Sequence, residues 1–547
     1  MTHENFAQSV APRRGPIFSH PQALRIFGPA GAGKTASVVQ LLRQHVEDGD
    51  FDIQDAVICS FTRTASRDIA RRVRDDGDTE QSRYHCTLHA FVKRYYGFDS
   101  DIADTRLKEF FSAEGIDYEG GRPGDPEEWN TSETEGQTEG AQIIGFWSKC
   151  RNRMIPFEQG RREYAAPSEL ASWWVGDRLD RLWHKYVAWK SANSLIDFTD
   201  MLEMALESPP GASWPCFVLD EAQDSTPLQW AVANSIASRC DIAYIAGDDD
   251  QAVYEWSGAS PREFLDADVS AEDTLRINYR CSSRILDEAQ TLIRRNRLRH
   301  DKDMIAANEG GRIDRVHDLP ALDIGESTFV MGRAHYLLDG AMSELERRGY
   351  PFFDHRKKRG VNGTAATAFR RWHELAKGGR ISVDEWRLLC EKTIPSRGPW
   401  LTHGTKARLA KLDPEFRRET YVNADRLYVY GATEELVNAV KARSVEPLGG
   451  IPAQRRAYFR DVTMNHGPQY LEEATARAVC QVGPIHAFKG LECDHVVLHS
   501  GMPPAATREA LFDPEPERRV FYVGITRAKT RLTHLQGPAF AQWAEVV

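Results

Sequence analysis

Three glycines, a lysine and a threonine are gathered in the stretch FGPAGAGKT at residues 27–35. The stretch fits the pattern GxxxxGK[ST], in which backbone N–H groups turn inward around phosphate oxygens, the lysine reaches the β- and γ-phosphates, and the hydroxyl binds Mg²⁺. Apolar residues before it predict a short strand and the spacing after it predicts a helix, so the phosphates would lie at a helix N-terminus. The predicted phosphate-contacting residues are Gly28, Pro29, Ala30, Gly31, Ala32, Gly33, Lys34, Thr35 and Ala36.

A phosphate loop also needs a carboxylate ligand for Mg²⁺ and a group that activates water, and a pair of carboxylates can supply both. The stretch CFVLDEAQD at residues 216–224 reads as a buried strand with Asp220 and Glu221 at its C-terminal end, the edge where ligands of parallel sheets bind. Asp220 and Thr35 would hold Mg²⁺, and Glu221 would activate a water molecule. The alternative is that both acids cap a helix that begins near Ser225. Together with the phosphate loop, the pair favours hydrolysis of a nucleoside triphosphate.

The elements that must position these residues belong to a large chain of ordinary globular composition. Its 547 residues are 41% apolar and 27% charged, which suggests several domains of roughly 150 residues each. No apolar run approaches the roughly 20 residues that span a bilayer, and the first residues lack the apolar stretch of a signal peptide. We therefore expect a cytoplasmic protein with no membrane partner. The nine cysteines are scattered singly, and we expect reduced thiols.

Charge is unevenly placed along the chain. The formal net charge is −10, which argues against a molecule coated in positive potential but leaves room for a local basic groove. Residues 118–140 are acidic and rich in Gly and Thr, as is typical of an exposed loop. Basic clusters at residues 294–300 and 355–360 are either solvated faces or contacts to phosphates, and both readings stay open.

Four longer stretches follow the phosphate loop and the acid pair in a characteristic order. They are IAGDDDQAVYEWSGA at 245–259, LRINYRCSSR at 275–284, IHAFKGLECDHVV at 485–497 and RRVFYVGITRAK at 518–529. The whole set resembles the superfamily 1 helicases of the UvrD/Rep/PcrA group, from residue 24 to residue 532. Shorter stretches at 60–73, 87–91 and 195–202 resemble minor motifs of the same family.

The resemblance implies an α/β fold of two RecA-like P-loop NTPase core domains, with ATP bound between them and a mainly helical subdomain inserted in each. The expected boundaries are 1–92 and 196–277 for the first core, 93–195 for the first insertion, 278–355 and 478–547 for the second core, and 356–477 for the second insertion. The second insertion is shorter than is usual in the family.

The resemblance also assigns roles at the ATP site. Gln251 matches the γ-phosphate sensor, an amide that can donate to an oxyanion without adding charge. Arg280 and Arg527 match two arginine fingers, which neutralise charge on the transferring phosphoryl group. Tyr279 matches the ring that stacks on adenine, and Glu492 an acid that contacts the nucleotide. The implied catalytic set is Lys34, Asp220, Glu221, Gln251, Arg280 and Arg527, with ATP and Mg²⁺ as cofactors.

A second set of residues resembles the lining of a single-stranded DNA path. Trp256 matches the family's tryptophan that stacks on bases, and Tyr254 would face the same side if the segment is a strand. The alternative for both rings is core packing. The remaining implied DNA-contacting residues are Thr62, Arg63, His89, Phe91, His486 and Lys489.

Two functions from different classes are compatible with these motifs. The first, implied by the family, is an ATP-dependent DNA helicase that translocates 3′ to 5′ on single-stranded DNA, unwinds tailed duplexes and acts as a monomer, with an oligomer left open. The second is a nucleic-acid-stimulated ATPase subunit of a nuclease, repair or phage-defence complex, in which a protein partner supplies what the chain lacks. The short second insertion favours this alternative.

Overall fold

The computed structural model describes residues 18–60, 63–74, 82–98, 101–119, 138–163, 177–317, 324, 327–356, 359–467, 480–537 and 541–543. The chain divides into two compact units. The first comprises Met1–Gly311, Pro504–Thr526 and Val546–Val547, and the second comprises Arg312–Pro503 and Arg527–Glu545. Residues 278–311 and 504–526, which the sequence analysis assigns to the second core, thus belong to the first unit, and the predicted core boundaries stay a prediction.

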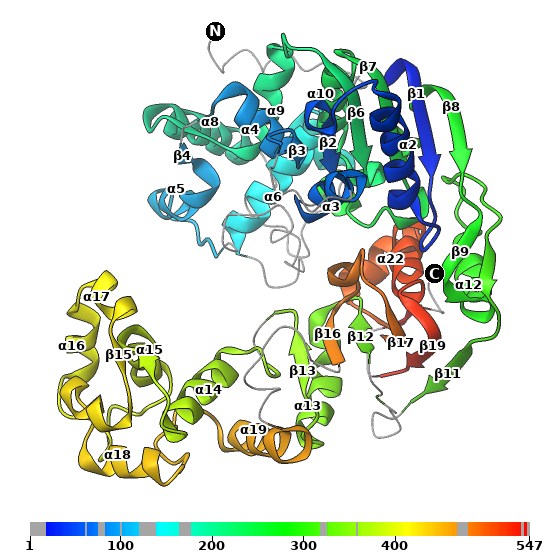
Figure 1. Ribbon diagram of the computed structural model, residues 1–547. Helices are drawn as coiled ribbons and strands as arrows, with labels where there is room; N and C mark the ends of the chain where they lie inside the picture. The colour runs from blue at the N-terminus through cyan, green and yellow to red at the C-terminus, as the bar shows by residue number, and fades with distance from the viewer. Residues whose placement is uncertain are drawn as a thin grey trace. The chain divides into compact units, whose positions relative to one another are not determined.

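A six-stranded parallel sheet of order β3-β2-β6-β7-β1-β8 forms the centre of the first unit (Figure 1). Its strands are β1 (Ser19–Phe27), β2 (Val57–Ser60), β3 (His85–Cys86), β6 (Trp214–Asp220), β7 (Cys240–Gly247) and β8 (Asp268–Thr274). Since neighbouring parallel strands end at the same edge, the carboxyl ends of β1, β6 and β7 meet there. The phosphate loop and the acid pair directly follow two of these ends.

Helices cover both faces of this sheet, which explains its continuous apolar strands. Alternate strand residues belong to two separate clusters: Val218 packs with the helices α2 and α3, whereas Phe217 and Leu219 pack with α4, α9 and α10. The helix bounds are α2 (Lys34–Asp48), α3 (Arg63–Arg74), α4 (Leu88–Tyr96), α9 (Phe198–Glu207) and α10 (Pro227–Ala237).

The first insertion is mainly helical and has a core of its own around Trp147 and Tyr186. Its elements are β4 (Asp101–Ile102), α5 (Leu107–Ala113), α6 (Glu139–Asn152), α7 (Phe157–Glu163), α8 (Arg178–Ala192) and β5 (Leu195–Ile196). The first unit is completed by α11 (Pro261–Leu265), β9 (Ile277–Ser282), α12 (Ser283–Ile293), β10 (Ile305–Asn308), α21 (Pro504–Phe512) and α22 (Glu515–Ile525).

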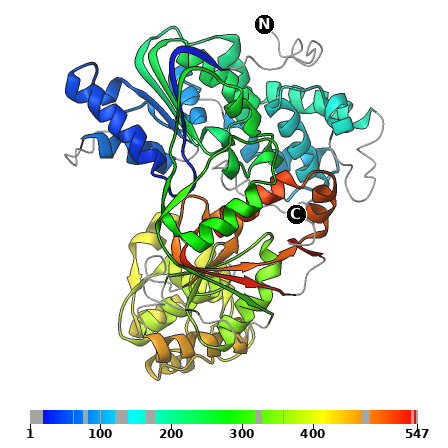
Figure 2. The same cartoon turned by 90° about the vertical axis from the view of Figure 1, so that its right-hand side faces the viewer.

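The second unit contains another six-stranded parallel sheet, of order β11-β19-β17-β12-β16-β13; Figure 2 shows its green and orange-to-red strands side by side. The strands are β11 (Arg312–Val316), β12 (Thr328–Gly332), β13 (Phe352–Asp354), β16 (Cys480–Pro484), β17 (Cys493–His499) and β19 (Ala528–Leu535). The helix α13 (Asp339–Arg347) packs on this sheet through Met342 and Leu345.

In the part of the second unit's insertion that the structure describes, there are six α-helices, one 3₁₀ helix (Ala424–Tyr430) and a short strand pair. The α-helices and strands are α14 (Thr364–Ala376), β14 (Ile381–Ser382), α15 (Val383–Lys392), α16 (Thr405–Lys411), α17 (Pro414–Glu419), β15 (Tyr421–Val422), α18 (Glu434–Lys441) and α19 (Ala453–His466). One hydrophobic cluster runs from Val330 and Val482 of the sheet to Trp372 and Trp386 of these helices. The predicted α/β fold class with helical insertions is confirmed.

Two general features of the chain complete the description. All nine cysteines are described as free thiols, and all but Cys240 are buried. None of the helices that the structure describes is both long enough and apolar enough to cross a bilayer.

Candidate functional site

The phosphate loop joins the end of β1 to the start of α2, which begins at Lys34 itself. Gly31 and Gly33 have φ of +74° and +81°, in the left-handed region that favours glycine. A Cβ atom at Gly31 would lie 2.5 Å from Cβ of Arg280, and one at Gly28 would lie 2.4 Å from Cβ of Lys34. Gly28 and Gly31 are therefore required by the approach of Lys34 and Arg280, and Gly33 by its positive φ.

Lys34 lies against the acid pair at the end of β6. Its Nζ is 2.7 Å from Oε1 of Glu221 and 3.7 Å from Oδ1 of Asp220. Burial opposes a charge on this amine, but the two carboxylates raise the pKa of Lys34 above its ordinary value of 10.5, so it is protonated. The predicted convergence of Lys34 with Asp220 and Glu221 is thus present in the first unit.

The environment of Asp220 fits a divalent cation. The residue is 2% exposed, and its Oδ1 has no hydrogen-bond partner among the described residues. Burial raises the pKa of Asp220 to about 6, although Lys34 opposes the shift. A cation on this oxygen would remove the cost of a buried, unsatisfied carboxylate. Thr35, in the first turn of α2, is half-buried and would supply the second protein ligand.

Glu221 is held in a conformation that non-glycine residues seldom adopt. Its φ is +55°, and a left-handed residue of this kind costs of order 1–3 kcal/mol. Oε2 of Glu221 accepts from Nε2 of Gln223 at 2.7 Å, while Oε1 accepts from Lys34. The alternative of simple helix capping is not what the structure shows for α10, where Thr226 is the N-cap.

Gln251 is joined to the phosphate loop through a residue that the sequence analysis did not single out. Its Nε2 donates to Oδ2 of Asp248 at 2.6 Å, and the same oxygen accepts from the backbone N–H of Ala30 at 3.1 Å. The N–H of Asp248 in turn donates to Oε1 of Gln223 at 2.9 Å. Asp248 and Gln223 therefore link the predicted sensor to the loop and to the acid pair. The sequence signal that could have identified these two residues was their position inside the motifs GDDDQ and DEAQD.

Tyr279 and Arg280 lie beside the same loop. The N–H of Tyr279 donates to the carbonyl of Gly31 at 2.9 Å. Buried Asn278, a second residue that was missed, donates to the carbonyl of Ala30 at 2.6 Å and accepts from the N–H of Arg280 at 2.9 Å. The Tyr279 ring is 62% exposed and is therefore open to a flat partner such as a purine.

Arg527 and Glu492 belong to the second unit. Arg527 precedes β19, is 1% exposed, and donates from Nη1 to the carbonyl of Leu491 at 3.2 Å. Glu492 pairs with Lys529 at 2.8 Å. Both assigned roles at the nucleotide stay predictions.

Comparison with known proteins identifies the family of the chain. The sequence model of the UvrD/REP helicase N-terminal domain matches residues 13–272, and that of the UvrD-like helicase C-terminal domain matches residues 469–535. Together these matches cover more than half of the chain. The chain belongs to the UvrD/REP helicase family.

Curated relatives of this family are distant. The chain is 23% identical over 362 residues to the ATP-dependent DNA helicase PcrA of Staphylococcus aureus (strain Mu50 / ATCC 700699), which is 60% of this chain and 45% of the relative. It is 24% identical over 329 residues to the protein of the same name from Leuconostoc citreum, covering 56% and 40%. The match therefore spans less than half the length of these relatives.

The two aromatic rings expected on the family's DNA path differ in exposure. The residues Glu255–Ser257 form a 3₁₀ turn, so the expectation of a strand here was wrong. Tyr254 is 7% exposed and Trp256 is 45% exposed, with their ring centroids 6.4 Å apart at 74°. A 3₁₀ turn does not place residues two apart on one face. Trp256 is therefore exposed and Tyr254 is buried, and a DNA contact of either ring stays a prediction.

The other residues predicted on the DNA path fall into different environments. Phe91 is 1% exposed and packs on Tyr95 and Trp214, so its prediction as a base contact is not supported by its place in the core. His89 is half-buried against Phe198, and burial lowers its pKa to about 4, so it is neutral. Thr62 lies outside the described residues, and Arg63 begins α3 with its side chain also outside them.

His486 and Lys489 lie in the second unit, on the loop between β16 and β17. Burial, assisted by Arg333 and Arg356, lowers the pKa of His486 to about 3, so its ring is neutral. Its Nε2 is enclosed without a hydrogen-bond partner among the described residues. Lys489 is half-buried at the end of the 3₁₀ helix Ile485–Phe488.

Proposed function

We propose that this chain is an ATP-dependent DNA helicase or translocase that moves on single-stranded DNA. The observation that carries the proposal is the convergence of Lys34, Asp220, Glu221 and Gln251 at the carboxyl edge of β1, β6 and β7, together with exposed Trp256 five residues beyond Gln251. Because Gln251 and Trp256 lie on one short segment, binding of a base to Trp256 would affect ATP hydrolysis through few intervening residues.

The residues of the first unit divide the hydrolysis between them. Lys34 would leave Glu221 for the phosphates, and the freed carboxylate would orient the attacking water. Gln251 would donate to the γ-phosphate, and Arg280 would neutralise charge on the transferring group. Thr35 and Asp220 would hold Mg²⁺, which would supply positive charge beside the phosphates. Tyr279 would stack on adenine.

The finer assignments rest on the family alone. These are 3′ to 5′ movement, unwinding of tailed duplexes, monomeric action, the two-core division with its boundaries, and the roles of Arg527, Glu492, His89, His486 and Lys489. The PcrA relatives are named ATP-dependent DNA helicases, and less than half of their length is matched. We carry their activity to this chain only as part of the proposal.

A second candidate is a DNA-stimulated ATPase subunit of a nuclease, repair or phage-defence complex. The observation that favours it is that the two family matches leave residues 273–468 outside them. The inserted helices of the second unit therefore have no stated family role and are available for a protein partner.

The deciding experiment is the steady-state ATPase rate of the purified chain with and without single-stranded DNA, with single-stranded RNA for comparison. Strong stimulation by DNA supports the translocase, and tailed duplexes with 3′ or 5′ overhangs then determine polarity and unwinding. Stimulation without unwinding supports the subunit hypothesis. Basal hydrolysis that neither nucleic acid changes would contradict both.

A further inference from the structure

The loop between α12 and β10, residues 294–304, contains the basic cluster 294–300, for which solvent and phosphate contacts were both left open. Two cations of this loop, Arg299 within the cluster and Lys302 just after it, are buried. The side chain of Arg299 is 7% exposed and that of Lys302 is 0% exposed. Buried charges of this kind are normally paired. Their partners show what the loop does.

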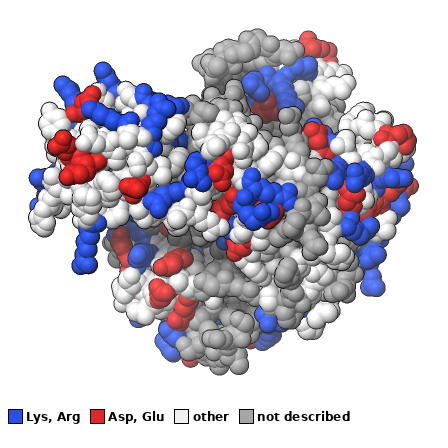
Figure 3. All heavy atoms as spheres, turned by 90° about the horizontal axis from the view of Figure 1, so that it is seen from below, with Lys and Arg blue, Asp and Glu red and all other residues white. Residues whose placement is uncertain are grey.

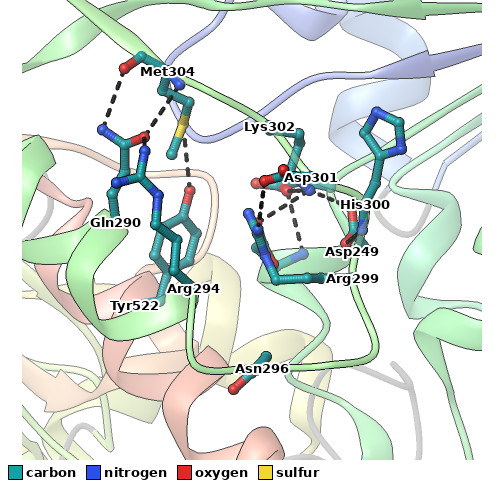
Figure 4. Close-up of polar contacts among 12 residues, drawn as sticks. Asp249, Gln290, Arg294, Asn296, Arg299, His300, Asp301, Lys302, Met304 and Tyr522 are labelled. Carbon is teal, nitrogen blue, oxygen red and sulfur yellow. Dashed lines mark hydrogen bonds and ion pairs between the residues drawn. The ribbon is translucent and has the colours of Figure 1, made fainter.

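Lys302 and Arg299 neutralise three consecutive carboxylates that follow β7. Asp248, Asp249 and Asp250 are each 0% exposed. Nζ of Lys302 lies 3.1 Å from Oδ1 of Asp248 and 3.2 Å from Oδ2 of Asp250, and it also pairs with Asp249 (Figure 4). Arg299 donates from Nε and Nη2 to the two oxygens of Asp250 at 3.1 Å and 2.9 Å. Without the cations of this loop, the three aspartates could not stay both ionised and buried, because burying an unpaired charge is costly.

The carboxylate of Asp248 transmits this support to the nucleotide site. While Oδ1 pairs with Lys302, Oδ2 accepts from the Gln251 amide and from the Ala30 N–H of the phosphate loop. Lys302 thus holds the carboxylate of Asp248 in place, and that carboxylate orients the Gln251 amide. The ion pairs of Lys302 are with Asp248, Asp249 and Asp250, which are not among the residues proposed to bind phosphate.

The same loop also contacts the end of β1. His300 stacks on Phe27, with ring centroids 3.8 Å apart and an interplanar angle of 6°, and its N–H donates to Oδ2 of Asp249 at 2.7 Å. Phe27 is the last residue of β1, directly before the phosphate loop. The loop is therefore held against the ends of both β1 and β7.

The helix α22 contacts the other side of the loop and also the 3₁₀ turn Glu255–Ser257, which carries Trp256. Glu515 accepts from the N–H groups of Arg297 and Leu298 at 2.8 Å and 3.2 Å. Arg519, 1% exposed, donates to the carbonyl of Leu298 at 2.7 Å and to Oε1 of Glu255 at 2.8 Å. Glu255 directly precedes exposed Trp256 in the sequence.

We infer that residues 295–302 form a strut in which Arg299 and Lys302 are positioning residues for Gln251, and that Arg519 and Glu255 connect this strut to the turn of Trp256. The inference rests on the proposed function, because it names the route by which a base on Trp256 affects the γ-phosphate sensor. A displacement of the turn would move Arg519, the strut and Asp248 together, and hence the Gln251 amide.

The first test is turnover of Lys302→Met without DNA. We expect kcat for ATP to fall about 10²-fold, since a displacement of about 1 Å at a catalytic group costs that much. KM should stay within about threefold, because the phosphate loop keeps its own backbone donors. The matched control is Asp303→Asn on the same loop, whose side chain is 74% exposed in an ion pair with Arg294; its kcat should equal that of the wild type.

Lys302→Met also leaves three buried carboxylates without their lysine, so a charge-balanced variant separates positioning from folding. Lys302→Met/Asp249→Asn removes one cation and one anion together. If the double variant has a low kcat but melts at the same temperature as the wild type, the result supports the strut. Wild-type kcat in the double variant overturns it, since Lys302 would then only balance charge.

The second test is Glu255→Gln, which removes the ion pair with Arg519 but keeps the size of the side chain. We expect basal ATPase within about twofold of the wild type and stimulation by single-stranded DNA reduced at least about fivefold. Unchanged stimulation overturns the link to Trp256. If the wild type hydrolyses ATP but ignores DNA, the proposed function itself fails, while basal turnover of the Lys302 variants still decides the positioning role.

Discussion

Lys34 is a buried cation shared by two carboxylates, so its loss affects both binding and charge balance. Lys34→Ala is expected to abolish ATP turnover, because the β- and γ-phosphates lose their cation. Glu221→Gln should do the same by removing the base while keeping the shape. Steady-state ATPase assays measure both, and circular dichroism melts check the fold. Lys108→Ala, on the exposed side of α5, is the control. Normal turnover in either site variant would contradict the site assignment.

Asp220 should make the fold sensitive to pH when no metal is bound. Its folded-state pKa of about 6 lies above its ordinary value of 3.8, so folding binds a proton between these pH values. Stability is therefore lost as pH rises from about 4 to about 6, and the loss is complete above pH 6. Asp220→Asn should raise the melting temperature in EDTA at pH 7.5 and raise it about half as much at pH 5, midway between the two pKa values. Exposed Asp301→Asn should show no such pH dependence, and an equal effect at both pH values would refute the buried, cation-seeking carboxylate.

The sequence predicted the proximity of the proposed catalytic residues, but not the residues that support them. Lys34, Asp220 and Glu221 follow strand ends within single motifs, so local spacing placed them. Asp248 and Gln223 depend on hydrogen bonds between separate strand ends, which no local pattern encodes. The burial of Phe91 was missed for a related reason: an aromatic ring near a motif has the same sequence whether it faces DNA or the core.

At the scale of elements, the 3₁₀ turn Glu255–Ser257 separates two aromatic rings that a strand would have kept together. Trp256→Ala should raise the DNA concentration for half-maximal ATPase stimulation about tenfold, within the roughly 1–3 kcal/mol of base stacking. Basal ATPase should change less than twofold, because the phosphate site is intact. Phe512→Ala, 92% exposed in the same unit, is the matched aromatic control. Equal losses of basal and stimulated activity would show that Trp256 is a packing residue.

Three helices of the first unit are joined by a buried cluster of charges. Lys190 of α8 lies 2.6 Å from both Asp197 and Asp200 at the N-terminus of α9, and Arg151 of α6 pairs with the same two acids. The acids also form the capping box of α9. The cluster therefore fixes the first insertion to a helix that packs on the sheet.

Lys190→Met should destabilise the chain by about 3–5 kcal/mol, because it leaves a buried carboxylate without one of its cations. Urea denaturation followed by circular dichroism measures the loss. The control is Lys185→Met on the same helix, whose surface pair with Glu114 leaves it 60% exposed and which should cost less than about 1 kcal/mol. Equal midpoints for the two variants would mean that the buried cluster contributes no more than a surface pair.

Element types followed from periodicity, but element partners did not. The strand before the phosphate loop, the buried strand at β6 and the helix α2 are all where apolar spacing predicts them. The basic cluster at residues 294–300 was interpreted as a solvated face or as a contact to phosphates, because its charges are visible in the sequence while the acidic partner of Arg299 is 49 positions away. Ion pairs between residues far apart in the sequence depend on the tertiary fold, so the local sequence could not predict them.

At the scale of the whole molecule, a net charge of −10 gives no overall attraction to DNA, so any attraction must come from local basic regions. The face drawn in Figure 3 has blue and red side chains interspersed rather than gathered by sign. Residues 356–477 are an exception in the sequence, with 23 Lys and Arg against 14 Asp and Glu. In the proposed translocase, DNA affinity would therefore come from a limited number of local phosphate contacts and from stacking.

These two sources of affinity respond differently to salt. The logarithm of the DNA affinity, taken from ATPase stimulation, should fall linearly with the logarithm of salt concentration, by about 0.7 per neutralised phosphate on a single strand. Lys489→Ala should reduce that slope by about 0.7, since it removes one phosphate contact. Trp256→Ala should weaken binding at every salt concentration and leave the slope unchanged, since stacking releases no counterions. Basal ATPase, which depends on buried charges, should be nearly constant across the same range. A slope that Trp256→Ala lowers and Lys489→Ala does not would reverse the assigned roles of the two residues, and with them the proposed path of the strand.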